Sequence, residues 1–320
     1  MRNENILEPV CGILREFYGL SPAGITEQKG GWSARAFRVE AEGRRYFLKV
    51  YDKEESSTAQ WTANLGIYLP FLASAGELEG WTPRTVPASD GRLWAEDNRF
   101  LTILADYIEG RDLGGQILSQ EQASQLGTIL GRLHSLKSFA QTLEPVREAF
   151  AVPFCENLRE LLDGREYSTI PGDIRGILQK YAGPLERLTD LLDASAARQK
   201  ARELPFVPCH TDIHGWNLMQ GEHLYLIDWE GLRYAPMEAD FFALTGLPQF
   251  PALWEAYRRE RPEAAIDPDC LEFYQLRRRC EDIWEFAARI LQDKLDEKTR
   301  QESFAGFAGE CAALAEIFPG

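Results

Sequence analysis

The hydrophobic pattern of the chain changes from alternation to helical spacing near residue 108, and this change constrains the fold most. Before it, ARAFRVEA and RRYFLKVY alternate apolar and polar residues around an EGR turn. Residues 25–51 are therefore predicted to form loop, strand, turn and strand. One helix is predicted over 56–76, and two more strands flank EDN in RLWAEDNRFLTILADYI. This region predicts an antiparallel sheet with one inserted helix.

Beyond residue 108 the spacing favours helices. The segment SQEQASQLGTILGRLHSL carries one continuous apolar face. Helical patterns extend to about residue 203 and resume after a short strand-and-loop segment at 206–231. We therefore predict an α+β fold with a β-rich N-terminal lobe at 1–108 and a mostly helical C-terminal lobe at 109–320. A cleft between two lobes is a preferred place for a ligand.

The charge balance and the cysteines narrow the class of protein. The chain has 50 acidic and 35 basic residues, a net charge of −15, which argues against a nucleic-acid partner. The simplest explanation of the acidic charge is that it keeps the protein soluble, and the second is that it favours a cationic ligand. The six cysteines form no Cys-x-x-Cys pair, the start has no signal pattern, and no apolar run approaches the roughly 18 residues of a membrane span. We expect a cytoplasmic protein without a membrane partner; the oligomeric state stays open.

The stretch PCHTDIHGWNLM supports two interpretations. The first is a zinc site, because cysteine, histidine and aspartate all ligate zinc. Its residues would be Cys209, His210, Asp212 and His214. However, a proline and a glycine in the stretch predict a loop, so no helical face aligns the two histidines. A further ligand is not evident either, since His134 lies on an apolar helix face and is predicted to pack in the core.

The second interpretation uses a longer spacing. Asn217 follows Asp212 by five residues, and Asp228 follows Asn217 by eleven, at the end of the apolar run LYLI. Two carboxylates and an amide beside short strands suit Mg²⁺ bound to phosphates, and leave Asp212 free to meet a substrate hydroxyl. The same order resembles the catalytic loop and metal site of protein kinases. The alternative is that Asp212 and Asn217 only satisfy backbone groups of their loop.

A lysine in the N-terminal lobe fits the kinase pattern. Lys49 lies on the second strand of the hairpin, after the loop KGGWS, where a kinase places its phosphate-binding lysine. Backbone amides of Gly30 and Gly31 and the hydroxyl of Ser33 are predicted to lie near phosphate oxygens. The alternative for Lys49 is a solvated residue on a strand.

The segment LADYIEG lies where the two lobes join. If the chain binds a nucleotide, backbone groups of Asp106, Tyr107 and Ile108 are placed to form hydrogen bonds with an adenine. An ordinary linker between a strand and a helix is the equal alternative.

These residues resemble a known family. HTDIHGWNLM with LYLIDWEGLRYAPMEADFFAL is similar to the aminoglycoside phosphotransferase and choline-kinase-like family of small-molecule kinases. LGTILGRLHSL resembles the family's Leu-Gly…Leu-His helix. LEFYQLRRRCEDIWEFAARIL is similar to the C-terminal helix of the spectinomycin-phosphotransferase-like branch.

The resemblance implies a protein-kinase-like two-lobe fold, with nucleotide binding in the N-terminal lobe, ATP or GTP as phosphoryl donor, and Mg²⁺. The roles it implies are Asp212 as catalytic carboxylate, Asn217 and Asp228 on the metal, Lys49 on the α- and β-phosphates, His210 as a brace of the catalytic loop, and Asp240 as a structural anchor. The chain departs from the family in two respects: the glycine loop is loose and contains the bulky Trp32, and the lysine lacks its usual helix acid. The helix after the lysine strand contains AQWTANL and no acid to pair with Lys49.

The acceptor is the least constrained part of the prediction. The predicted substrate-side residues are Glu230, Glu281, Asp282 and Glu285. A solvated helix face balanced by neighbouring arginines is the alternative for the last three. Together with the acidic charge, the resemblance favours an aminoglycoside or spectinomycin-like antibiotic as substrate. Alternatives are an amino alcohol, a sugar amine or a homoserine-type metabolite, a nucleotide-binding pseudokinase, and a zinc hydrolase.

Overall fold

The structure, a computed structural model, describes residues 6–28, 34–55, 58–164, 170–293 and 295–318. Contacts divide the chain into two compact units. Unit 1 comprises Met1–Arg147, Val207–Ala235 and Leu244–Ala264, and unit 2 comprises Glu148–Phe206, Pro236–Ala243 and Ala265–Gly320. An antiparallel sheet near the N-terminus and a mostly helical remainder confirm the predicted α+β class. The division into a nucleotide-binding lobe at 1–108 and a catalytic lobe at 109–320 is based on the roles expected of the two parts and stays a prediction.

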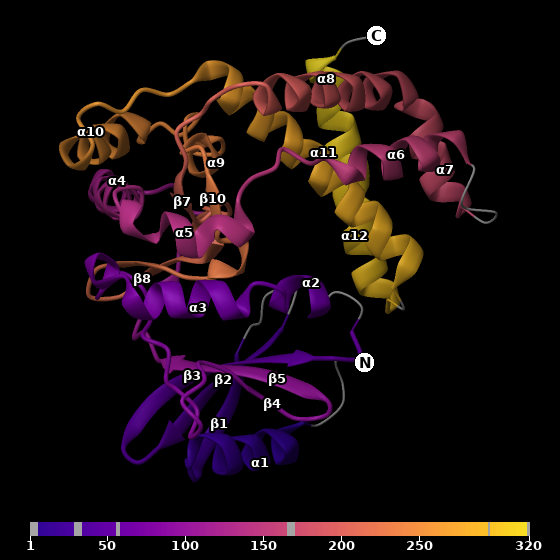
Figure 1. Ribbon diagram of the computed structural model, residues 1–320. Helices are drawn as coiled ribbons and strands as arrows, with labels where there is room; N and C mark the ends of the chain where they lie inside the picture. Colours follow the sequence, from indigo (N-terminus) through magenta and orange to yellow (C-terminus); the bar gives the residue numbers. More distant parts are fainter. Residues whose placement is uncertain (1–5, 29–33, 56–57, 165–169, 294, 319–320) are drawn as a thin grey trace. The chain divides into compact units, whose positions relative to one another are not determined.

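Unit 1 contains a five-stranded sheet in the order β1-β2-β3-β5-β4, with neighbouring strands antiparallel (Figure 1). Its strands are β1 (Pro22–Gln28), β2 (Arg35–Ala41), β3 (Arg44–Asp52), β4 (Ala95–Glu96) and β5 (Phe100–Asp106). The prediction of a loop from residue 25 is wrong, because β1 pairs with β2 along this stretch. The burial of β1 does not alternate regularly, so its sequence carried no strand signal.

Helix α1 (Leu7–Tyr18) packs on one face of this sheet. Its buried residues Val10, Ile13 and Leu14 join a core cluster with Leu48 and Val50 of β3. Burying each such side chain stabilises the fold by about 1.5–3 kcal/mol. Because successive residues of a strand point to opposite faces, Lys49 lies on the face away from α1.

The helical stretch predicted over 56–76 consists of two helices in its described part, so the prediction of one helix is wrong. Helix α2 (Thr58–Thr62) ends before Asn64, and α3 (Leu65–Ser74) begins after it. The carbonyl of Asn64 accepts hydrogen bonds from the amides of Ile67 and Tyr68, which starts a new helix there. In Figure 1, α3 lies on the side of the sheet opposite to α1.

The remaining elements of unit 1 carry or support the loops near the candidate site. A three-stranded sheet has the order β6-β8-β9, and β7 pairs with β10. The strands are β6 (Arg111–Asp112), β7 (Val207–Cys209), β8 (Leu218–Gln220), β9 (Leu224–Leu226) and β10 (Arg233–Ala235). The helices are α4 (Gln120–Leu133), α5 (Ala140–Leu143) and α10 (Phe250–Glu260). Short 3-10 turns are η1 (Gly76–Leu78), η2 (Lys137–Phe139), η3 (Glu144–Val146), η4 (Gly215–Asn217) and η5 (Trp229–Gly231).

Helix α4 begins with a capping box formed by Ser119 and Gln122. It packs closely against α10, and Gly127 makes this approach possible. A Cβ atom at Gly127 would lie 2.1 Å from the carbonyl oxygen of Leu253. The first glycine of the LGTILGRLHSL segment is therefore a packing requirement.

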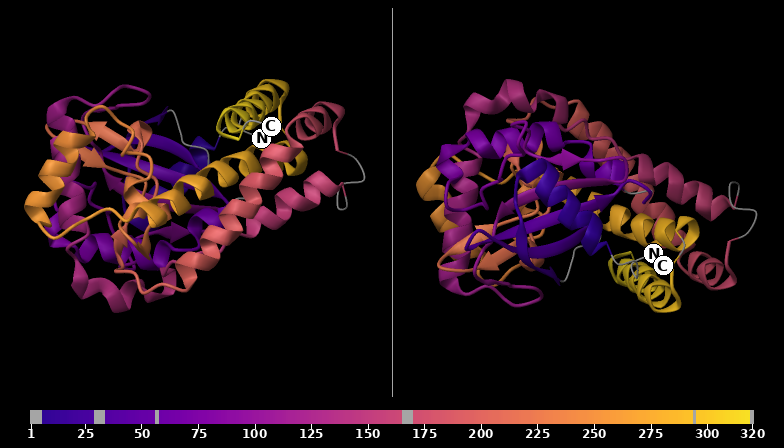
Figure 2. Two further views of the ribbon diagram at one scale, coloured as in Figure 1. Left: turned by 90° about the horizontal axis from the view of Figure 1, so that it is seen from above. Right: turned by 90° about the horizontal axis from the view of Figure 1, so that it is seen from below.

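Unit 2 is helical in its described part. Its helices are α6 (Pro153–Asp163), α7 (Gly172–Lys180), α8 (Ala182–Lys200), α9 (Glu238–Phe241), α11 (Pro268–Gln292) and α12 (Glu297–Ile317). Helix α11 packs against α6, α8 and α12, and both views of Figure 2 show α11 and α12 side by side. None of the described helices combines the length and the apolar character needed to cross a membrane.

Candidate active site

Unit 1 contains the described residues that are predicted to bind phosphate, metal and the substrate hydroxyl. Lys49 comes from β3, Asp212 and Asn217 from the segment between β7 and β8, and Asp228 from the short link between β9 and η5. The predicted loop residues Gly30, Gly31 and Ser33 lie outside the described residues.

His210 connects the loop of Asp212 to the segment before Asp228. It is fully buried, and its Nε2 lies 2.9 Å from the carbonyl oxygen of Ile227. The backbone N–H of Asp212 donates to Nδ1 of the same ring. Nδ1 therefore accepts and Nε2 carries the proton, a neutral tautomer that both bonds require. The ring edge also packs on Trp229, with centroids 4.8 Å apart. This geometry supports the predicted bracing role of His210.

Asp212 is held by the residue five positions later. The Nδ2 atom of Asn217 lies 3.0 Å from Oδ2 of Asp212 and 2.8 Å from its backbone oxygen. His214 approaches the same carboxylate, with Nε2 at 3.3 Å from Oδ2. Asn217 is buried, whereas the carboxylate of Asp212 remains 39% exposed. The loop therefore fixes one carboxylate oxygen while leaving the group open to a ligand.

Two residues of the site have left-handed backbone conformations. Thr211 has φ of 71° and Asp228 has φ of 73°. Such values are uncommon for side chains with a Cβ atom, and rare for a β-branched one. The hydroxyl of Thr211 donates to the carbonyl oxygen of Gly231 at 2.8 Å, which ties the two segments together. Strained backbone held by surrounding bonds is a common feature of functional sites.

Lys49 pairs with two carboxylates that sequence reasoning did not assign to it. Its Nζ donates to both Asp228 and Glu230, and the hydroxyl of Tyr51 donates to Glu230. Tyr51 and Lys49 share a face of β3 because they are two residues apart. Tyr68 of α3 also interacts electrostatically with Lys49 and Glu230.

The charges in this cluster shift one another's titration. Burial alone would lower the pKa of Lys49, but Asp228 and Glu230 raise it overall. Burial would raise the pKa of Asp228, but the attraction of Lys49 lowers it to about 2. Burial raises the pKa of Glu230, and repulsion from Asp228 adds to this, so that Lys49 offsets the rise only in part. At neutral pH, Lys49 and Asp228 are therefore both charged.

The donor atoms near Asp228 fit a hard divalent cation. The amide nitrogen of Asn217 is occupied by Asp212, which leaves its Oδ1 on the other side of the group. The N–H of Ile227 donates to the backbone oxygen of Asn217 at 3.0 Å, so this residue lies next to the segment that carries Asp228. A carboxylate and an amide oxygen are donors that Mg²⁺ accepts.

The predicted adenine segment begins with Asp106, the last residue of β5. The N–H of Asp106 donates to Arg84, and the N–H of Tyr107 lies 3.4 Å from the carbonyl oxygen of Arg45. Within the described part of the chain, the N–H and C=O of Ile108 form no backbone hydrogen bond. Ile108 therefore offers the two groups that the edge of a purine base requires.

The predicted substrate-side acids are found in different surroundings. Glu230 is enclosed beside Lys49, with 7% of its side chain exposed. On α11 of unit 2, Glu281 pairs with Arg277 at 2.8 Å and Asp282 pairs with Arg278 at 2.8 Å. Each of these two acids thus has an arginine partner one turn away on the same helix. Glu285 lies on the same helix.

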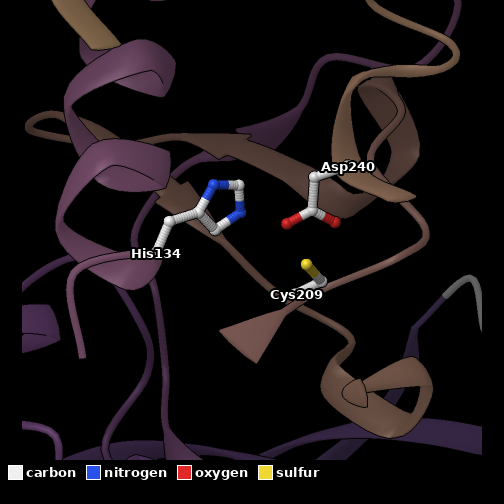
Figure 3. Close-up of side chains that lie close together, drawn as sticks. All are labelled: His134, Cys209 and Asp240. Atoms are coloured by element: carbon white, nitrogen blue, oxygen red, sulfur yellow. The ribbon is translucent and has the colours of Figure 1, made fainter. Parts of the chain in front are cut away.

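The residues of the zinc interpretation are engaged otherwise. Both ring nitrogens of His210 are used by the backbone, and the thiol of Cys209 faces the carbonyl oxygen of Ala235 at 3.5 Å. Figure 3 shows this thiol beside His134, the residue that follows α4, whose Nδ1 lies 2.9 Å from the hydroxyl of Tyr257. His134 is buried in unit 1, as predicted. Asp240, also drawn there, is a buried residue of α9 in unit 2, in keeping with a structural role.

Sequence reasoning missed the partners of Lys49. The alternation of β3 placed Tyr51 on the same face as Lys49, and this signal was available. Nothing local indicated Glu230, because it lies 181 residues further along the chain.

The chain is similar in sequence and in fold to known proteins. A sequence model of the family described as Phosphotransferase enzyme family matches residues 24–274. Protein StrN of Streptomyces griseus is 26% identical over 236 residues, which is 70% of this chain and 70% of StrN.

Among solved structures, a spectinomycin phosphotransferase, APH(9)-Ia, in complex with ADP and spectinomycin is similar with a TM-score of 0.75 and 21% identity. The match covers 96% of this chain and 98% of that protein. A choline/ethanolamine kinase family protein from Mesorhizobium loti is similar with a TM-score of 0.58 and 18% identity, over 98% and 95% of the two chains. These likenesses confirm the predicted kinase-like fold.

Proposed function

The chain belongs to the phosphotransferase enzyme family, and from that premise we propose that it transfers the γ-phosphoryl group of ATP to a hydroxyl of a small amine-bearing or polyhydroxyl molecule. The resemblance stated from the sequence is thereby confirmed at the level of the family. The observation that carries the proposal is the clamp of Asn217 on Asp212, in the same compact unit as the paired Lys49.

Asp212 is the proposed catalytic carboxylate. With one oxygen held by Asn217, it presents a fixed acceptor to the hydroxyl of the substrate and takes its proton as the new P–O bond forms. The bond between the γ-phosphorus and the bridging oxygen breaks, and ADP leaves with that oxygen. Since the transition state of phosphoryl transfer is loose, positioning and charge neutralisation supply most of the rate.

Lys49 is the proposed phosphate ligand. Its ammonium stays protonated beside two carboxylates, and we propose that it contacts the α- and β-phosphates. Asn217 and Asp228 would hold Mg²⁺, which when bound neutralises charge on the phosphates. The backbone groups of Ile108 would bind the adenine edge, and Asp106 and Tyr107 come directly before it in the same segment.

Two classes of acceptor have support. The likeness to a spectinomycin phosphotransferase favours an aminocyclitol or aminoglycoside. The likeness to a choline/ethanolamine kinase family protein favours an amino alcohol or another small metabolite. Both classes carry an amine and a hydroxyl, and the net charge of −15 suits either.

A nucleotide-consumption screen with Mg²⁺ tests the proposal. The panel holds spectinomycin, aminoglycosides, amino alcohols and sugar amines, each with ATP and with GTP. We expect turnover with at least one acceptor. Asp212→Asn should lower kcat by about 10²- to 10⁴-fold, the usual contribution of a general base, while ADP binding and thermal unfolding stay unchanged. Near-normal turnover by Asp212→Asn would refute the assignment.

A further inference from the structure

Lys49 meets two carboxylates whose surroundings differ. The side chain of Asp228 is 37% exposed, whereas that of Glu230 is 7% exposed and also accepts a hydrogen bond from Tyr51. An incoming phosphate or cation can therefore reach Asp228, while Glu230 is enclosed by the protein. The pair between Lys49 and Glu230 can therefore remain when a nucleotide binds, whereas the pair between Lys49 and Asp228 is open to exchange with the ligand.

The backbone around Glu230 is fixed on both sides. Before it, Trp229 is buried and its Nε1–H donates to the carbonyl oxygen of Leu226 at 3.1 Å. After it, the carbonyl of Gly231 accepts the hydroxyl of Thr211, the residue before Asp212. The carboxylate that holds Lys49 is therefore tied to the loop that carries Asp212.

The helices that follow β3 supply no competing acid. Residues 56–76 contain neither aspartate nor glutamate, and from α3 the uncharged Tyr68 interacts with the cluster. A buried ammonium requires a carboxylate partner, because an unpaired charge away from water is costly.

We propose that Glu230 is the positioning residue for Lys49: it aims the ammonium at the nucleotide and couples it to the loop of Asp212, in place of an acid from the following helix. This inference rests on the proposed function. It also differs from the substrate-side role predicted for Glu230 from the sequence.

A double-mutant cycle tests the proposal through ATP binding and steady-state kinetics. The variants are Glu230→Gln, Lys49→Met and the double substitution. Each single change should weaken ATP binding and lower kcat/KM for ATP by about 10- to 100-fold, the size of one charged hydrogen bond. The double variant should match Lys49→Met within about 2-fold, because Glu230 acts through the lysine.

Three further readouts separate positioning from other roles. The KM for the acceptor and the Mg²⁺ concentration for half-maximal rate should stay unchanged in Glu230→Gln. Tyr51→Phe removes the hydrogen bond to Glu230 and should lower kcat/KM for ATP less than Glu230→Gln does. Glu96→Gln breaks the exposed pair with Lys53 and serves as control, with ATP binding and thermal unfolding unchanged.

Losses that multiply in the double variant would overturn the proposal. A raised Mg²⁺ requirement with an unchanged KM for ATP would do so as well, and would make Glu230 a metal ligand. ATP binding can be measured without an acceptor. An enzyme without turnover on any acceptor would therefore contradict the proposed function and still leave the coupling between Glu230 and Lys49 measurable.

Discussion

The amide nitrogen of Asn217 lies 3.0 Å from Oδ2 of Asp212 and 2.8 Å from its backbone oxygen, so one side chain fixes both the carboxylate and the loop of its neighbour. The amide of Asn217 is a neutral donor, so it holds the Asp212 carboxylate without the full positive charge that a lysine or arginine would bring. The same contact turns the carbonyl oxygen of Asn217 away from Asp212. The nitrogen of the amide therefore holds Asp212, and its oxygen remains for the proposed metal ion.

His214 is expected to orient Asp212, because its Nε2 lies 3.3 Å from Oδ2 of that carboxylate. His214→Ala should lower kcat by about 10-fold, the lower end for a hydrogen bond to a charged group, with little change in KM for ATP. His214→Gln keeps a donor and should recover part of the loss. Steady-state kinetics at saturating substrates measure the effect, and equal rates for His214→Ala and the wild type would exclude this role.

Gly231 is expected to tolerate no larger residue. A Cβ atom there would lie 2.8 Å from Oγ1 of Thr211 and 3.0 Å from the carbonyl oxygen of His210. Gly231→Ala should lower the free energy of unfolding by about 1–3 kcal/mol through overpacking, and reduce activity by displacing the loop of Asp212.

Gly246→Ala is the matched control for this change, since its Cβ would meet nothing within 4 Å. Urea denaturation followed by tryptophan fluorescence compares the two variants. Equal stability of Gly231→Ala and Gly246→Ala would show that the Thr211 contact is dispensable.

Replacing two helical glycines by alanine is expected to change the stability of the protein in opposite directions. Gly127→Ala places a Cβ 2.1 Å from the carbonyl oxygen of Leu253 and should destabilise the protein by about 1–3 kcal/mol. Gly12→Ala in α1 meets nothing within 4 Å and should stabilise it by about 0.4–1 kcal/mol, because alanine favours a helix. Thermal unfolding midpoints measured in one buffer show whether each variant is more or less stable than the wild type. A Gly127→Ala variant that is more stable would contradict the close packing of α4 on α10.

Asp267 is expected to make the stability of unit 2 depend on pH in the acid range. Its Oδ1 caps α11 by accepting from the amides of Asp269 at 3.0 Å and Cys270 at 3.1 Å. The hydrogen bond from Arg202, together with these amides, lowers the pKa of Asp267 although burial opposes the shift. The stabilisation is therefore complete above the unfolded pKa of about 3.9 and is lost as the pH falls through the lower folded value.

Asp267→Ala should cost about 1 kcal/mol of unfolding free energy at pH 7, as expected for a lost cap. The difference from the wild type should shrink as the pH is lowered below about 4. Asp267→Asn retains a capping oxygen without the charge, so the contribution of the side chain at position 267 to the unfolding free energy should not depend on pH. Urea titrations between pH 7 and pH 3 follow the difference, and a gap that stays constant would mean that the carboxylate does not titrate as its contacts indicate.

The sequence by itself determined the features that depend on short stretches of chain. Alternation identified β2, β3 and β5, and helical spacing identified α4, because a half-buried element records its inner face in its own residues. The spacing of Asp212 and Asn217 indicated a shared task, since five residues of one loop bring the two side chains into contact. The family resemblance also followed from these motifs.

Only the tertiary structure decided the contacts between distant segments. It brought Glu230 to Lys49 across 181 residues, paired β1 with β2, and used both nitrogens of His210 for the backbone. A residue type and its immediate neighbours do not encode such contacts, because they depend on which strand ends the topology brings to one face of the sheet. The partner of a buried charge is therefore set by the fold, and for Lys49 that partner is a carboxylate no local pattern indicates.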